Sequence, residues 1–230
     1  MNTDNQIRAD TNECVILLHG LGRLKQSMSM LDRFLKGLGY TTLNLAYPST
    51  TKSIETIAET HLARAVQGCE ERGVEKVHFV GHSLGGIVVR QYLQRNSAPA
   101  GSRLVMLSPP NQGSELIDVL LHVPLYEWVT GPAGQELGTG PDSVVHRLKP
   151  VGIEIGVIAG SYSINLLFSA FLDGPDDGMV SVKSTKLPEM RDFIVVPNIH
   201  TFIMRDPQVM RQVAHFLRHG RFDHGGTAGA

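Results

Sequence analysis

Residues 77–86 read V-H-F-V-G-H-S-L-G-G, and this stretch decides the fold class. Val77–Val80 has the length and composition of a short buried strand, and apolar residues from Leu84 to Arg95 recur at helical spacing. Ser83 stands between them, at the centre of a G-x-S-x-G motif. In this motif the backbone turns so tightly that flanking side chains would collide with neighbouring elements, which glycine avoids. The stretch therefore predicts a serine hydroxyl raised above the end of a strand, next to the N-terminus of a helix.

The composition indicates one globular domain over residues 1–230. Of these residues 42% are hydrophobic and 19% are charged, and the formal net charge is -1. A near-neutral chain without a basic run does not favour nucleic acid as a partner. No apolar run reaches the roughly 18 residues that a transmembrane segment needs, and the polar N-terminus shows no export signal. We therefore expect a cytoplasmic location.

Six short apolar runs, each followed closely by glycine or proline, predict six strands. They are Val15–Leu18, Thr42–Tyr47, Val77–Val80, Leu104–Leu107, Ile153–Ala159 and Phe193–Val196. Helical spacing between them predicts helices at Ser53–Arg72, Leu84–Arg95 and Pro207–His219. Strands that alternate with helices predict an α/β fold, with a mostly parallel sheet covered by helices on both faces.

Residues 111–150 interrupt this alternation, because they contain no clear strand. A long excursion of this kind in an α/β domain is typical of a lid or cap over a binding site. The alternative is a set of extra helices that complete the core. At the other end of the chain, residues 221–230 are expected to form a flexible tail.

A serine nucleophile needs a base, a carboxylate that orients the base, and donors for the oxyanion. His200 is the histidine of choice among ten, because it directly follows the last predicted strand, at the edge where α/β sheets bind ligands. Asp177 lies in a loop after the fifth strand, with Asp176 as its main competitor. That loop could instead be a solvated acidic turn or a weak calcium loop. Ser83 could also be only a helix cap.

The second oxyanion donor is expected in the turn H-G-L-G at residues 19–22, which follows the first strand. Its glycines leave the Leu21 N–H free to face the site, beside the Leu84 N–H at the start of the helix after Ser83. A plain turn after a strand is the alternative.

The order Ser83, Asp177, His200 is that of the α/β-hydrolase superfamily, and the chain resembles the bacterial lipase and carboxylesterase branch of it. H-G-L-G resembles the family's oxyanion loop, G-H-S-L-G-G the lipase elbow and N-I-H-T-F the histidine loop. D-D-G-M-V at residues 176–180 resembles the lipase pattern N-D-G-L-V, in which the aspartate before glycine is the triad acid. The resemblance assigns that role to Asp177.

The resemblance spans Val15 to His219 and implies a reduced sheet of about six strands, because only about a dozen residues precede the first strand. The lipase branch often has a calcium site, but no convincing ligand set occurs here. We therefore expect no metal and no cofactor.

These features predict a serine esterase that acts through an acyl-enzyme on Ser83, with His200 as base, Asp177 as its partner and the Leu21 and Leu84 amides as oxyanion hole. Two alternatives stay open: a thioesterase or acyltransferase with the same residues, and a non-catalytic scaffold that binds a lipophilic ligand or a partner.

Abundant apolar residues outside the strands favour an acyl ester or lipid-like substrate and transient contact with a membrane surface, although each of them could equally be core. The candidates for an acyl pocket are Leu116, Leu120, Leu121, Val123, Leu125, Tyr126, Trp128, Leu166, Leu167, Phe168, Phe171 and Leu172.

Cys14 and Cys69 form no C-x-x-C motif or metal-ligand spacing, and we interpret them as reduced core thiols. A disulfide is the alternative, because the helix that ends near Cys69 could pass over the strand that starts near Cys14.

Overall fold

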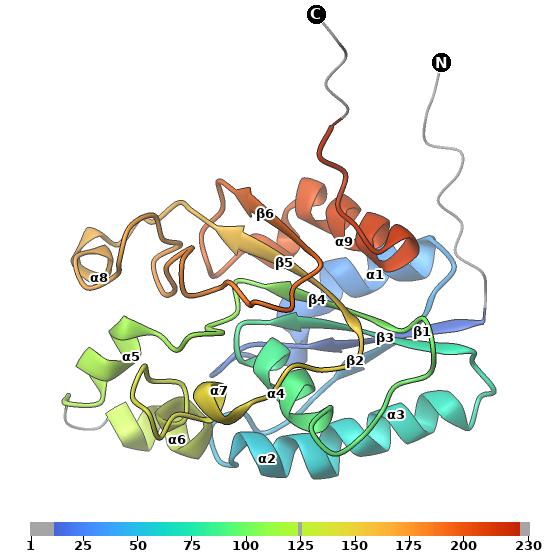
Figure 1. The fold of residues 1–230 in the computed structure, drawn as a ribbon, viewed down its shortest axis with the longest axis horizontal. Coiled ribbons are helices and arrows are strands. Elements are labelled where there is room, and N and C mark those ends of the chain that lie inside the picture. Colours follow the sequence, from blue (N-terminus) through green and yellow to red (C-terminus); the bar gives the residue numbers. More distant parts are fainter. Residues whose placement is uncertain (1–11, 124–125, 226–230) are drawn as a thin grey trace, which may run out of the picture.

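A single six-stranded parallel sheet forms the centre of the chain (Figure 1). The computed structural model describes residues 12–123 and 126–225. The strand order is β2-β1-β3-β4-β5-β6. The strands are β1 (Glu13–Leu18), β2 (Thr41–Leu45), β3 (Lys76–His82), β4 (Arg103–Leu107), β5 (Glu154–Gly160) and β6 (Asp192–Val196). All six expected strands are therefore present, and the expected α/β fold with a parallel sheet is confirmed.

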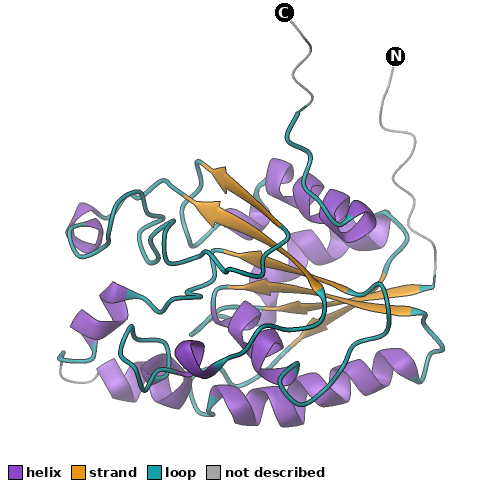
Figure 2. Cartoon of the chain, viewed as in Figure 1, coloured by secondary structure: helices purple, strands orange, loops and turns teal. Residues whose placement is uncertain are grey.

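Helices cover both faces of this sheet (Figure 2). One face carries α1 (Ser29–Gly37) and α9 (Pro207–His219), and the other carries α3 (Ala63–Glu70) and α4 (Leu84–Tyr92). Outside residues 111–150, several shorter helical elements lie between these helices and strands. They are η1 (Lys25–Met28), α2 (Ile54–Thr56), the π-helical η2 (Ile57–Leu62), α8 (Leu166–Ser169) and η3 (Ile203–Arg205). Because α2, η2 and α3 are continuous, they form the one crossover helix that the sequence predicts.

The ends of α9 follow from local sequence. The Asp206 side chain accepts hydrogen bonds from the Gln208 and Val209 N–H groups, and Pro207 occupies the first position, where no N–H is needed. Gly220 ends the helix with a φ of 70°, a left-handed conformation that glycine adopts without strain.

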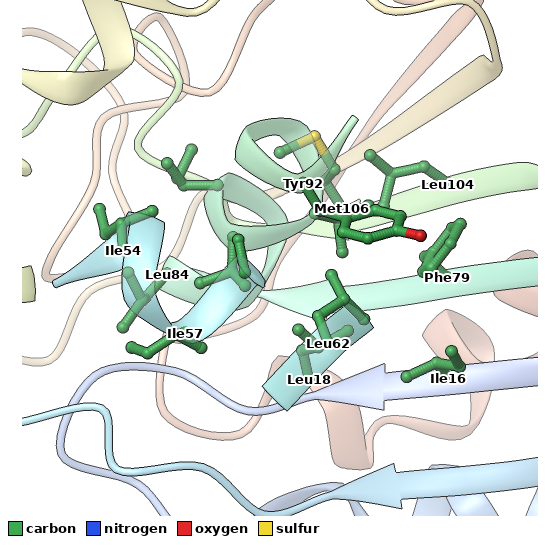
Figure 3. Close-up of a cluster of buried hydrophobic side chains, with 14 of the residues drawn as sticks. Ile16, Leu18, Ile54, Ile57, Leu62, Phe79, Leu84, Tyr92, Leu104 and Met106 are labelled. Carbon is green, nitrogen blue, oxygen red and sulfur yellow. The ribbon is translucent and has the colours of Figure 1, made fainter. Parts of the chain in front are cut away.

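Alternate side chains of each strand enter two separate cores. In β1, Ile16 and Leu18 face the α3 and α4 side, whereas Val15 and Leu17 face the α1 and α9 side. Figure 3 shows the first core, in which Leu84 packs against residues from η2 and α2. The helix that follows Ser83 is thereby held rigidly against the sheet.

The segment 111–150 contains α5 (Glu115–Leu120), α6 (Tyr126–Gln135) and α7 (Val144–Arg147). Five of its apolar side chains are buried in the first core, which supports the alternative of core completion for them: Ile117, Ala133, Leu137, Val144 and Val145. The Glu136 carboxylate also accepts a hydrogen bond of 2.8 Å from the Ile54 N–H. Movement of this segment as a lid stays a prediction.

The interpretation of the cysteines as reduced thiols is wrong. Cys14 in β1 and Cys69 in α3 form a disulfide with a Cα–Cα distance of 6.2 Å, because the crossover helix passes over β1 on its way to β3. A disulfide is more typical of oxidising compartments than of the cytosol. The cysteines therefore do not support the expected cytoplasmic location.

The first residues of the expected flexible tail contact the folded domain, and flexibility of the tail stays a prediction. Phe222 is buried, and its N–H donates to the Asp192 carboxylate at 2.7 Å. The Asp223 N–H donates to the Gln212 side chain at 2.8 Å. Residues 226–230 lie outside the described residues.

Candidate active site

Ser83 lies at the turn between β3 and α4 with φ 52° and ψ -121°, a conformation that is costly for a residue other than glycine. The neighbouring glycines explain why the chain can adopt it. A Cβ on Gly81 would lie 2.3 Å from the Gly86 nitrogen, and one on Gly85 would lie 2.6 Å from the Leu18 oxygen. The backbone of β1 and α4 thus leaves room only for glycine on both sides of Ser83.

Asp177 and His200 form a hydrogen-bonded pair. The His200 Nδ1 lies 2.8 Å from the Asp177 Oδ2, and the His200 backbone N–H donates to the Asp177 carbonyl at 2.9 Å. The other carboxylate oxygen, Oδ1, accepts from the N–H groups of Met179 at 3.1 Å and Val180 at 2.9 Å. The Asp177 side chain is completely buried. Two hydrogen bonds thus orient His200 on Asp177, and two more fix the Asp177 carboxylate within its own turn.

Asp176, the competing carboxylate, has a different environment. Its Oδ1 accepts from the Ser169 hydroxyl at 2.9 Å and from the Gly178 N–H at 2.7 Å. These bonds attach α8 to the turn, and neither involves a histidine. The structure therefore brings Asp177, and not Asp176, to His200.

The oxyanion-loop candidates lie where two loops meet above the sheet. Leu21 lines the same cavity as Ser83, and Leu84 opens α4. Within the described part of the chain, neither the Leu21 N–H nor the Leu84 N–H donates a hydrogen bond. Binding of an oxyanion by these two amides stays a prediction, because Leu84 is buried and does not line the described cavity.

Residues that the sequence analysis did not single out hold this loop. The Tyr47 hydroxyl donates to the His19 carbonyl, and the two rings stack with centroids 4.0 Å apart. The Ser49 hydroxyl accepts from the Gly22 N–H at 3.1 Å. Both lie just after β2, and no sequence pattern connects them with the H-G-L-G turn.

His82 joins the elbow to the histidine loop. Its Nε2 donates to the His200 carbonyl at 3.0 Å, and the two rings lie 4.8 Å apart. Burial, followed by the charge of His200, lowers the pKa of His82 well below its ordinary value. His82 is therefore neutral near pH 7. The sequence analysis assigned it to packing or hydrogen bonding, and the structure shows which bond it makes.

A cavity of about 280 Å³ opens beside Ser83 and His200. Most of its exposed surface is apolar. The polar side chains that line it are Arg23, Thr50, His82, Ser83, Ser114, Thr130, His200 and Thr201. The apolar side chains are Leu21, Pro110, Ile117, Leu120, Leu137, Met179 and Val180. Figure 1 shows α5, α6 and α8 at the side of the sheet where the strands end, and the cavity lies at this edge.

Of the described acyl-pocket candidates, Leu116, Leu121, Val123, Phe168 and Leu172 do not line the cavity. Leu120 lines the cavity. Leu166, Leu167 and Phe171 are exposed by 79%, 79% and 51%, and they do not line it. Leu125 and the side chains of residues 126–129 lie outside the described residues.

The described residues contain neither a membrane-spanning helix nor a group of metal ligands. Residues 12–123 and 126–225 contain no helix long and apolar enough to cross a bilayer. In the same ranges, no three histidine, cysteine, aspartate or glutamate side chains are grouped as a metal site would require.

Several solved structures share this fold. The mature form of lipase BlEst2 from Bacillus licheniformis superposes with a TM-score of 0.75, at 19% identity, over 92% of this chain and 94% of that one. A monoacylglycerol lipase from Paleococcus ferrophilus gives 0.59 at 18% identity, over 93% and 97%. A lipase-esterase related protein from Clostridium acetobutylicum gives 0.58 at 14% identity, over 92% and 96%.

No curated protein matches the sequence. The model of the alpha/beta hydrolase family matches residues 15–218. The matched range includes the turn around Ser83 and the loops that contain Asp177 and His200. It leaves out only the two ends of the chain. The chain therefore belongs to the alpha/beta hydrolase family.

Proposed function

We propose that this protein hydrolyses carboxylic esters through an acyl-enzyme on Ser83. His200 Nε2 takes the proton from the Ser83 hydroxyl as Oγ attacks the ester carbonyl. Asp177 keeps the proton of His200 on Nδ1 and stabilises the imidazolium that forms. The N–H groups of Leu21 and Leu84 bind the oxyanion. His200 then protonates the leaving alcohol, and water repeats the cycle on the acyl-enzyme.

One observation carries this proposal: a histidine oriented by a buried carboxylate opens into the same cavity as a serine in a strained turn. Because Nδ1 of His200 is bonded to Asp177, the neutral ring has its lone pair on Nε2. No described residue makes a hydrogen bond to that nitrogen, so a base is available at the cavity.

The cavity supports an acyl substrate, because most of its lining is apolar. Exposed apolar residues near α8 support contact with a lipid surface during catalysis, and Ile164 and Leu166 are exposed by 74% and 79%. The same site is suited to thioesters, so the experiment must compare both bond types.

The test is hydrolysis of p-nitrophenyl esters over a series of acyl lengths, with acyl thioesters of the same lengths in parallel. Ser83→Ala is expected to lower kcat by on the order of a millionfold. Ser97→Ala, on the exposed turn after α4, is the matched control and keeps wild-type kcat. Equal activity of Ser83→Ala and wild type contradicts the proposal, and faster turnover of thioesters than of esters favours the thioesterase alternative.

A reactive-serine probe provides a second readout. A fluorophosphonate should label the wild-type chain and the Ser97→Ala variant but not Ser83→Ala. If the wild-type chain is not labelled, the non-catalytic scaffold becomes the better interpretation.

A further inference from the structure

Arg23 carries a permanent charge, unlike the other described residues that line the catalytic cavity. It directly follows the H-G-L-G turn, is half-buried, and lines the cavity together with Ser83 and His200. The described lining contains no other arginine, and no lysine, aspartate or glutamate. Among the described lining residues there is therefore one permanent charge, and that charge is positive.

No group within the described residues neutralises this charge. The Arg23 backbone N–H donates to the Gly20 carbonyl, but the guanidinium makes no ion pair and no hydrogen bond there. Other arginines that are removed from solvent do have partners. Arg103 binds the Glu154 carboxylate at 2.7 Å and the Leu217 carbonyl at 2.7 Å. Arg23 is thus an exception that needs an explanation.

The surroundings of Arg23 offer no compensation either. The nearby His82 is neutral, and the charge of Arg23 is one of the smaller effects that lower the pKa of that ring, after burial and the charge of His200. The rest of the lining that the structure describes is apolar or carries no permanent charge. A partly desolvated cation without a partner is unfavourable, and an anionic ligand would relieve this cost.

A guanidinium binds phosphate and carboxylate groups through two parallel hydrogen bonds, which gives both affinity and orientation. We propose that Arg23 makes the enzyme selective for acyl esters that carry an anionic oxygen group, a phosphate or a carboxylate, near the ester bond. This inference rests on the proposed esterase function and names its substrate class. The apolar lining holds the acyl chain, and Arg23 holds the anionic group.

The kinetic test compares matched substrates that differ in one charge. The first pair is 1-decanoylglycerol 3-phosphate and 1-decanoylglycerol, and the second is mono-p-nitrophenyl glutarate and p-nitrophenyl pentanoate. Hydrogen bonds to charged groups contribute about 1.5–3 kcal/mol, so kcat/KM for the anionic member is expected to be about 10- to 100-fold higher. A preference within the first pair identifies a phosphate headgroup, and one within the second identifies a carboxylate.

Substitutions at Arg23 then assign the preference. Arg23→Gln should reduce the ratio of anionic to neutral kcat/KM to near one, and Arg23→Lys should retain part of it. Arg33→Gln is the matched control, because Arg33 is an exposed arginine on α1 and its guanidinium bonds only the Ser29 carbonyl at 3.3 Å. No anionic preference in the wild type, or a preference that persists in Arg23→Gln, overturns the inference.

A binding experiment separates this inference from the proposed function. Octyl phosphate and octanol are titrated calorimetrically into the full chain carrying Ser83→Ala, with and without Arg23→Gln. Octyl phosphate is expected to bind at least about tenfold more tightly, and Arg23→Gln should remove the difference. If the wild-type chain cleaves no ester but shows this binding, the esterase proposal fails and the anion site stands. If neutral esters are cleaved and octyl phosphate binds no better than octanol, only the anion site fails.

Discussion

The sheet carries a buried histidine–carboxylate pair at each of its two edges, and only one pair has the properties of a catalytic group. At the carboxyl edge, His200 Nδ1 lies 2.8 Å from the Asp177 carboxylate. At the amino edge, His78 Nε2 lies 3.1 Å from the Glu13 carboxylate. The residue types and distances are similar, so they do not distinguish the two roles.

The second ring nitrogen makes the difference. His78 Nδ1 accepts the Arg103 backbone N–H at 3.0 Å, and the side chain is completely buried. Both nitrogens of His78 are therefore used, and the ring only connects β1, β3 and β4. His200 is bonded at one nitrogen and opens with the other into a cavity. The combination of a carboxylate at one nitrogen and a free nitrogen facing a cavity marks His200 as the candidate base, since His78 lacks the free nitrogen and His82, which has an unpaired Nδ1, lacks the carboxylate.

The largest expected effect comes from a comparison of two single variants, in each of which one of these histidines is replaced by glutamine. His200→Gln removes the base, and ester hydrolysis per folded molecule should fall by about 10⁴- to 10⁶-fold. His78→Gln should leave turnover per folded molecule unchanged and lower stability by about 1–3 kcal/mol, because it breaks buried hydrogen bonds. Steady-state kinetics and urea denaturation of both variants measure activity and stability. A large loss of turnover in His78→Gln, with activity retained in His200→Gln, would assign the catalytic role to His78.

The next effect tests the carboxylate. Asp177→Asn keeps the shape but no longer holds the His200 proton on Nδ1, and kcat should fall by about 10⁴-fold. Asp176→Asn is the matched control in the adjacent position, with an expected loss below about tenfold since Asp176 only orders the turn. Stopped-flow or steady-state kinetics suffice, and a larger loss for Asp176→Asn would assign the triad acid to that residue.

A smaller effect concerns the disulfide near the Glu13 pair. Cys14 and Cys69 are 55 residues apart, and a cross-link of such a loop stabilises a protein by about 2–4 kcal/mol. Cys14→Ala with Cys69→Ala should therefore lower the urea midpoint and leave kcat unchanged. Wild type treated with reductant should behave like the double variant, and an unchanged midpoint in both would show that the cross-link does not contribute.

The smallest effect is a pH dependence at the amino edge. A hydrogen bond from His78, opposed by burial and helped by Lys76, lowers the pKa of Glu13 to about 2 from its ordinary 4.5. The resulting stability is present above pH 4.5 and is lost as the pH falls towards 2. Glu13→Gln should cost at most about 3 kcal/mol at pH 7, and the difference from wild type should vanish near pH 2.

Urea denaturation at a series of pH values provides the measurement for Glu13. Burial also lowers the pKa of His78, so both proteins should lose further stability below pH 6.5, where the unfolded chain takes up a proton that the folded state resists. A constant difference between Glu13→Gln and wild type from pH 7 to pH 2 would contradict the assigned ion pair.

Local sequence was sufficient for the strands, the elbow and the order of the three site residues. Each depends on neighbours in the chain: apolar runs stopped by glycine or proline, glycines around Ser83, and a loop directly after a strand. The helix α1 could also have been found, because Leu31 and Leu35 have helical spacing. The role of Asp177 needed the resemblance to lipase motifs, since Asp176 has the same chemistry.

The features that were missed or misjudged depend on contacts between distant segments. The disulfide joins residues 55 positions apart, and the Tyr47–His19 contact that holds the H-G-L-G turn joins the ends of two strands. The charge of Arg23 is unpaired because no described acidic side chain lines the cavity. A local sequence pattern cannot show such an absence.

Short-range sterics and hydrophobic periodicity therefore determined the parallel α/β sheet and the edge at which the site lies, because they act between residues close in the chain. Tertiary packing decided which of two histidine–carboxylate pairs keeps a free nitrogen, that the two cysteines meet, and which arginine stands alone in the described lining of the cavity. Those outcomes depend on burial and on partners from other elements, and both exist only once the chain has folded.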